Sequence, residues 1–68
     1  MSVYKVIEIV GTSDVSWEDA AAKAVERAGK TLEDLRIGEV VTQDVTINNG
    51  LVIAYRTKLS VSFKFKED

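Results

Sequence analysis

The side chains best able to hold a ligand in this chain are acids and cations, because the sequence contains no histidine and no cysteine. Three acids, Asp14, Glu18 and Asp19, lie close together at the start of a helical pattern. Carboxylate oxygens suit calcium, which subunits could share, although the spacing is not that of an EF-hand loop. The same acids also suit the first turn of a helix, where they interact favourably with its dipole. Both interpretations stay open.

A second group of candidates is cationic. Alternate residues of an extended strand share one face, so four cations near the C-terminus define a basic stripe. The stripe suits an anionic ligand or an acidic partner, whereas solvation or pairing with acids of a neighbouring subunit is the alternative. The residues of the basic stripe are Arg56, Lys58, Lys64 and Lys66.

Trp17 is the only tryptophan. It either stacks on a ligand or packs over a sheet at the first helical turn.

Composition disfavours several classes of function. Without histidine or cysteine, Ser–His, Cys–His and zinc-hydrolase chemistry is absent, and we expect no enzyme. A net charge of −2 disfavours a general nucleic-acid binder. We find no membrane-spanning stretch and no signal-peptide pattern, and expect a cytoplasmic protein. Residues 1–68 form one small domain, which is marginal without oligomerisation, a ligand or a cation.

Alternation of apolar and polar residues over positions 51–65 predicts one long strand. A flat strand of this length spans roughly 50 Å, whereas a globule of this size is about 30 Å across. The strand must therefore curl around the rest of the chain or continue into a neighbouring subunit. Its apolar face consists of Leu51, Ile53, Tyr55, Thr57, Leu59, Val61, Phe63 and Phe65.

The first half of the chain predicts a strand and a helix. Residues 3–10 are mostly apolar on both faces, which indicates cover on both sides. Residues 11–14 predict a turn. Ser16 then has the position of an N-cap for a helix over residues 17–28, with Gly29 as its C-cap.

The second half predicts a hairpin. Thr31 can cap a further short turn, and residues 38–47 predict a strand. Asn48-Asn49-Gly50 closes the hairpin, since Asn-Gly is a strong turn signal. One face of the strand over residues 38–47 would carry Val40, Thr42, Asp44 and Thr46.

The order strand, helix, strand, strand predicts the topology. A helix that returns across the sheet leaves the first two strands parallel, and the third is antiparallel to its hairpin partner. The simplest sheet places the third strand between the other two. We therefore predict an α+β fold, a three-stranded antiparallel sheet of order 2-3-1 curled around one helix.

The chain also resembles the dodecin family. Residues 4–13, Tyr-Lys-Val-Ile-Glu-Ile-Val-Gly-Thr-Ser, are similar to the opening strand and Gly-Thr-Ser turn of that family. The resemblance continues through the helix, the Glu39-Val40 start of the next strand and the closing Val61-Ser62-Phe63. It implies a β-α-β-β subunit of a hollow homododecamer. Many dodecins bind flavins, in pairs between subunits, for storage and not for catalysis.

The flavin contacts implied by the resemblance are altered here. Ile37 stands where flavin-binding dodecins have a stacking tryptophan, and Arg56 stands where they have a glutamine. Loss of an aromatic plane removes roughly 1–3 kcal/mol per contact, so binding of FMN or riboflavin would be weakened. The chain instead resembles a subgroup without this tryptophan, described as calcium-binding, whose metal ligands cannot be assigned to positions here.

Two interpretations of this altered position remain. In one, Ile37, Arg56, Arg36 and Gly38 bind a small ligand, planar or phosphate-bearing, at a subunit interface, since arginine suits carboxylate and phosphate. In the other, Ile37 packs on its symmetry mate and Arg56 pairs with Glu39 or Asp44. Our first functional hypothesis is therefore a non-enzymatic dodecin-family storage protein for such a ligand. The alternative is a calcium-binding dodecin that acts as an ion chelator or a structural shell.

Overall fold

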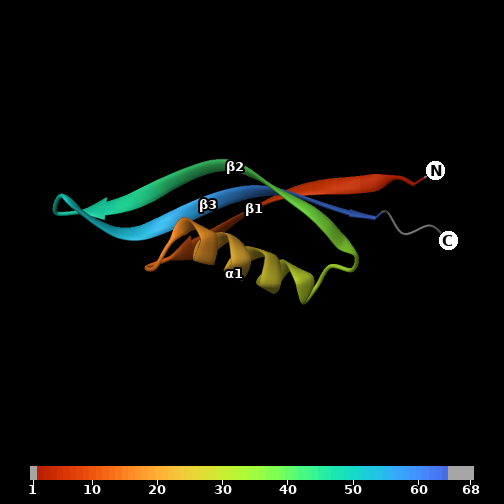
Figure 1. The fold of residues 1–68 in the computed structure, drawn as a ribbon, viewed down its shortest axis with the longest axis horizontal. Coiled ribbons are helices and arrows are strands. Elements are labelled where there is room, and N and C mark those ends of the chain that lie inside the picture. Colours follow the sequence, from red (N-terminus) through yellow and green to blue (C-terminus); the bar gives the residue numbers. More distant parts are fainter. Residues whose placement is uncertain (1, 65–68) are drawn as a thin grey trace.

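The computed structural model describes residues 2–64 as a three-stranded sheet with one helix against it (Figure 1). The strand order is β1-β3-β2, and both outer strands run antiparallel to β3. This confirms the predicted α+β fold and the central position of the long strand. Phe65 and Lys66 lie outside the described residues. The elements are β1 (Tyr4–Ser13), α1 (Trp17–Gly29), β2 (Leu35–Asn48) and β3 (Leu51–Lys64).

The core lies between α1 and the middle of the sheet. Leu59 and Val61 of β3 are buried against Ala24 of α1, and partly buried apolar residues surround them. The alanines allow a very close approach between helix and sheet. At Gly11 of β1, an added Cβ atom would lie only 2.0 Å from the backbone oxygen of Ala20. No helix within residues 2–64 is long and apolar enough to cross a membrane.

The β2–β3 hairpin is longer than the helix that covers it. Figure 1 shows its turn extending past α1, and the described chain measures 52 Å along its longest axis. Leu51 and Ile53, predicted on the apolar face, are therefore 69% and 52% exposed. Val6 and Val10 of β1 are exposed on the other side of the sheet. The sequence predicts that both faces of β1 are covered. Within one chain, only the face toward α1 is covered.

Several predicted boundaries are wrong. Residues 11–13 continue β1 because they pair with residues 55–57 of β3. The C-cap of α1 is Lys30, which has a right-handed φ of −74°, so Gly29 is not the C-cap. The Thr31 hydroxyl donates to the Ala28 oxygen at 3.4 Å and closes the helix instead of capping a new turn. Strand β2 begins at Leu35, earlier than predicted.

A β-bulge in β2 changes which side chains share a face. Val40 lies opposite Leu59, whereas Thr42 lies opposite Lys58, and the register shifts between them. The extra residue places Val40 and Thr42 on opposite faces, so the prediction that they share one is wrong. The hairpin prediction is confirmed: Asn49 and Gly50 have positive φ angles of 52° and 75°, as the tight turn between twisted strands requires.

Candidate functional site

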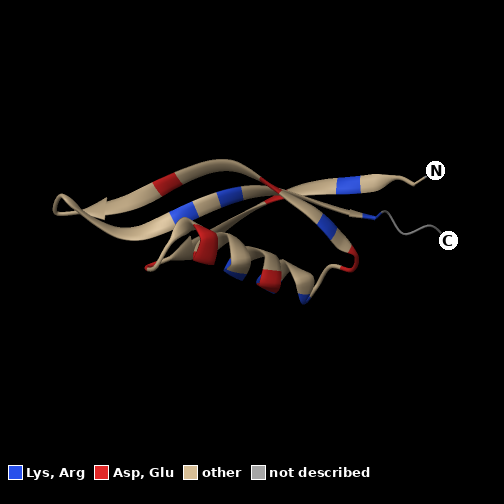
Figure 2. Cartoon of the chain, in the orientation of Figure 1, with Lys and Arg blue, Asp and Glu red and all other residues tan. Residues whose placement is uncertain are grey.

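The face of the sheet opposite α1, called the open face below, carries four paired charges. Buried residues of β3 alternate with more exposed ones, which project to the open face. Two cations of β3 each meet a carboxylate from a different outer strand, and Figure 2 shows cationic bands on β3 beside an acidic band on β2. We call Glu8, Asp44, Arg56 and Lys58 the charge quartet.

The stronger pair of the quartet joins Arg56 to Asp44. Arg56 Nε donates to Asp44 Oδ1 at 2.7 Å, and Nη2 donates to Oδ2 at 3.0 Å. This bidentate geometry matches the guanidinium fork to both carboxylate oxygens. The hydrogen bonds from Arg56 lower the pKa of Asp44 below its usual value. Of the two interpretations of Arg56, pairing with an acid is confirmed within the single chain, and the acid is Asp44.

Trp17 fixes the backbone next to this pair. Its indole Nε1 donates to the Asp44 backbone oxygen at 2.9 Å, and its ring packs edge-on against Tyr55 with centroids 5.2 Å apart. The buried Thr57 hydroxyl donates to the Trp17 backbone oxygen at 2.9 Å. The prediction that Trp17 packs over the sheet at the first helical turn is confirmed. The start of α1 and the middle of β2 are thus held together.

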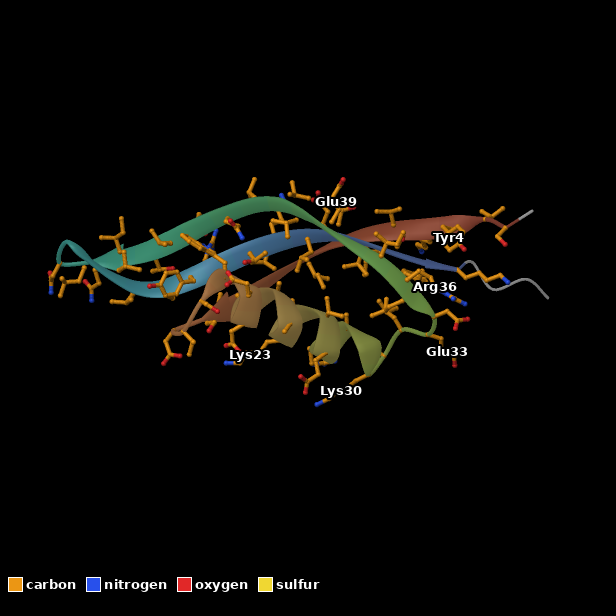
Figure 3. All side chains as sticks on the ribbon, in the orientation of Figure 1. Tyr4, Lys23, Lys30, Glu33, Arg36 and Glu39 are labelled. Atoms are coloured by element: carbon orange, nitrogen blue, oxygen red, sulfur yellow. The ribbon has the colours of Figure 1, made fainter. Side chains whose placement is uncertain are left out.

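The residues around Ile37 lie far from Arg56 within one chain. Ile37 is 67% exposed and lies opposite Ser62, whereas Arg56 lies six positions earlier on β3. At about 3.3 Å per residue the separation is roughly 20 Å. Gly38 follows Ile37, and Figure 3 shows Arg36 close to Glu33, at the start of β2. A small ligand that touches both Ile37 and Arg56 would therefore need residues from two copies of the chain.

One acid at the helix start, Asp19, takes part in a capping network. Ser16 accepts a hydrogen bond from the Asp19 backbone at 3.0 Å, which confirms the N-cap. Asp19 accepts from the Ser13 hydroxyl at 2.5 Å and lies 3.0 Å from Lys23. The Ser13 bond, followed by that from Lys23, lowers the pKa of Asp19. These contacts stabilise the folded chain while Asp19 is ionised. Their contribution to stability is present above about pH 4 and is lost as the pH falls through the folded-state pKa of Asp19.

The network engages Asp19 but neither Asp14 nor Glu18. Asp19 is engaged with Ser13 and Lys23, while Asp14 and Glu18 are exposed. Within the part of the chain that the structure describes, no group of three acids is placed to hold a metal ion. The helix-capping interpretation is thus confirmed for Asp19. The role of Ser13 was not predicted from the sequence; its buried hydroxyl also accepts from the Val15 backbone at 2.9 Å.

A shallow groove of about 390 Å³ lies between α1 and β1. Ile9, Val10 and Gly11 form one side, and the other side is formed from α1 by Lys23, Ala24, Arg27 and Ala28. The sequence did not predict this groove, because its shape depends on how closely the helix approaches Gly11.

Comparison with known proteins decides the family. The sequence model of the Dodecin family matches residues 3–66, nearly the whole chain. This chain belongs to the dodecin family. The resemblance read from the Gly-Thr-Ser turn and its flanking strands is therefore confirmed. Dodecins are small non-enzymatic binding proteins, in agreement with the expectation that this chain is not an enzyme.

Individual dodecins match over almost their full length. Calcium dodecin from Mycobacterium tuberculosis is 53% identical over 97% of this chain and 93% of its own length. Its crystal structure, described as that of a calcium-chelating antigen with a novel calcium-binding site, superposes with a TM-score of 0.86, covering 96% of this chain and 93% of that one. Dodecin from Streptomyces davaonensis is 32% identical, with a TM-score of 0.91 and 97% of each chain covered.

Proposed function

We propose that this dodecin is a calcium-binding, non-enzymatic protein that works as a closed homo-oligomer, a dodecamer by analogy with its family. The observation that carries the proposal is the 53% identity to calcium dodecin over 97% of the chain. Among dodecins this favours calcium chelation, or a shell stabilised by calcium, over flavin storage.

The distribution of acids supports a site shared between copies. Calcium takes about 6–8 oxygen ligands, whereas no group of three acids is assembled within residues 2–64. Asp19 and Asp44 already accept hydrogen bonds from Ser13 and Arg56. Exposed acids such as Asp14 and Glu18, together with backbone oxygens, would complete a site only when copies meet.

The shape of the chain supports assembly. Its radius of gyration is 14.0 Å, whereas a compact domain of this length is expected near 11 Å. Part of the excess comes from the hairpin, which extends past α1 (Figure 1). Exposed apolar residues at its end include Ile47, Leu51, Val52 and Ile53. A second copy that covers them would remove apolar surface from water.

Calcium is expected to raise the thermal midpoint of the oligomer, because an ion that binds only the folded assembly stabilises it. At about one hundred times its Kd, calcium would add about 2.7 kcal/mol to the free energy of unfolding. Thermal scans with calcium, with a chelator, and with magnesium at equal ionic strength would measure this effect. Calorimetry would give the stoichiometry, and sedimentation the mass of the assembly.

Matched variants separate specific binding from general charge effects. Glu18→Gln removes an exposed acid at the helix start, and Glu33→Gln removes one from the loop before β2. Calcium affinity should fall for Glu18→Gln and stay unchanged for Glu33→Gln. Equal thermal midpoints with calcium and with chelator, together with no calorimetric signal, would remove calcium as the ligand.

A second candidate function is binding of a small ligand on the open face. It is supported by the exposed, unpacked side chain of Ile37, which shares that face with Arg56, as their partners Ser62 and Asp44 indicate. Arg36 and Gly38 flank Ile37. A site that uses Ile37 of one copy and Arg56 of another would accept a planar or phosphate-bearing molecule, with FMN and riboflavin as the flavins to test.

Flavin affinity is expected to be low, because Ile37 provides no aromatic plane on which the ring can stack. Riboflavin at fixed concentration would be titrated with the protein while its fluorescence is followed. Little quenching at micromolar protein is the expected result, and Ile37→Trp should increase it by restoring a stacking surface. Strong quenching by the unaltered protein would show that the stacking residue is dispensable.

A further inference from the structure

The charge quartet on the open face is neutral in sum, since Arg56 and Lys58 are matched by Asp44 and Glu8. The two cations lie two positions apart on β3, so they share a face about 7 Å apart. Alone, they would attract a phosphate group. Each is instead paired with a carboxylate from a neighbouring strand, so the open face has no unmatched cation at this position.

The two pairs differ in geometry. Asp44 occupies the Arg56 fork through two hydrogen bonds, at 2.7 and 3.0 Å. Lys58 meets Glu8 through one contact of 3.4 Å, which leaves the ammonium donors free to turn elsewhere. An incoming phosphate would need to displace Asp44 from Arg56 or to sit beside its negative charge, and both cost binding free energy.

The position of Asp44 is also fixed along the strand. The Trp17 indole donates to its backbone oxygen at 2.9 Å, and the strand pairs with β3 on both sides of the bulge. The backbone of Asp44 is therefore held in place, and the carboxylate can leave Arg56 only by rotation of its own side chain. Both side chains of the pair remain about half exposed, so a solvent-borne anion can still reach them.

From this geometry we propose that Asp44 is a specificity-determining residue. It neutralises Arg56 and keeps phosphate-bearing ligands off the open face, so that this face takes uncharged planar ligands in preference to their phosphorylated forms. The inference narrows the ligand class of the second proposed function and rests on that site. It does not depend on calcium.

The test compares full-length protein with and without the Asp44 carboxylate, using inorganic pyrophosphate as the probe. Asp44→Asn keeps the side-chain size and the backbone oxygen that holds Trp17. Calorimetry at low ionic strength, with a chelator present, should show pyrophosphate binding at least about tenfold tighter in Asp44→Asn than in the unaltered protein. The gain should shrink as salt is added.

Two further variants define what the gain means. Glu8→Gln removes the same charge from the same face but leaves the Arg56 fork occupied, so its gain should be clearly smaller. Adding Arg56→Gln to Asp44→Asn should abolish the gain. Asp44→Ser repeats the test without an amide, and Trp17 fluorescence checks that each variant is folded.

Several outcomes would overturn the inference. Pyrophosphate binding that is equal in Asp44→Asn and the unaltered protein would do so. An equal gain in Glu8→Gln would show that net charge alone matters and that Asp44 has no special role. A riboflavin titration carried well above micromolar protein separates this inference from the ligand-binding function. No riboflavin binding even there, combined with a pyrophosphate gain, would remove that function but keep the role of Asp44.

Discussion

Replacing Gly11 with alanine is expected to destabilise this fold strongly, because α1 packs directly against Gly11. The new Cβ would lie 2.0 Å from the Ala20 backbone oxygen and 2.9 Å from the Ala24 Cβ. Both neighbours belong to α1 and cannot rotate away, so the whole helix would have to move off the sheet. Overpacking typically costs about 1–3 kcal/mol and sometimes more. We expect the upper end or beyond, out of a total of about 5–15 kcal/mol.

Urea unfolding followed by circular dichroism would measure the loss. Gly38→Ala is the matched control, because Gly38 also lies in a strand and its added Cβ would come no closer than 3.6 Å to the Leu59 side chain. The control should change the unfolding midpoint little. A Gly11→Ala protein as stable as Gly38→Ala would show that α1 does not sit this close to β1.

Leu59→Ala should cost about 2–5 kcal/mol of folding free energy, the range measured for large-to-small changes in cores. Leu59 is only 4% exposed and lies at the centre of the sheet, between Ile9 of β1 and Val40 of β2. Ala24 packs from the helix side and is too small to fill the space. The loss combines two contributions: the transfer free energy that the removed atoms no longer provide, and the cost of the cavity left behind.

The same substitution at Leu51 provides the comparison, because Leu51 is 69% exposed near the hairpin turn. In the single chain it should cost less than about 1 kcal/mol. Denaturation would be repeated over a range of chain concentrations, since a second copy that covers Leu51 would make its loss depend on concentration. A loss at Leu59 no greater than that at Leu51 in dilute protein would contradict the assigned core.

The topology was predictable because its signals are local and repeated. The long alternation of β3 and the Asn49-Gly50 turn each predict an element without knowledge of the rest. Boundaries were less predictable. Nothing in the sequence indicates the bulge that turns Val40 away from Thr42, and residues 11–13 look like a turn although they pair with β3. In both cases pairing between strands outweighed the local preference of the residues.

The candidate site was only partly predictable for a related reason. The sequence identified Asp44 and Glu39 as possible partners of Arg56, but only the strand register selects Asp44. Ile37 and Arg56 looked like parts of one pocket, yet six positions of β3 separate them. The ligands of the proposed calcium site would depend on how the surfaces of two copies meet, and the alternation of residues along one chain does not encode this.

The pairing of β1 has a consequence for the order in which the chain folds. Tyr4 pairs with Lys64 and Ser13 with Tyr55, so within residues 2–64 the first strand pairs with the last one. The hairpin closes between strands that are neighbours in the sequence, whereas β1 cannot pair until β3 is in place. Until then Ile7 and Ile9 have no sheet to join. Pairing of β1 with β3 thus has a high contact order and is expected to follow hairpin closure, and until then the N-terminal strand is open to association with other chains.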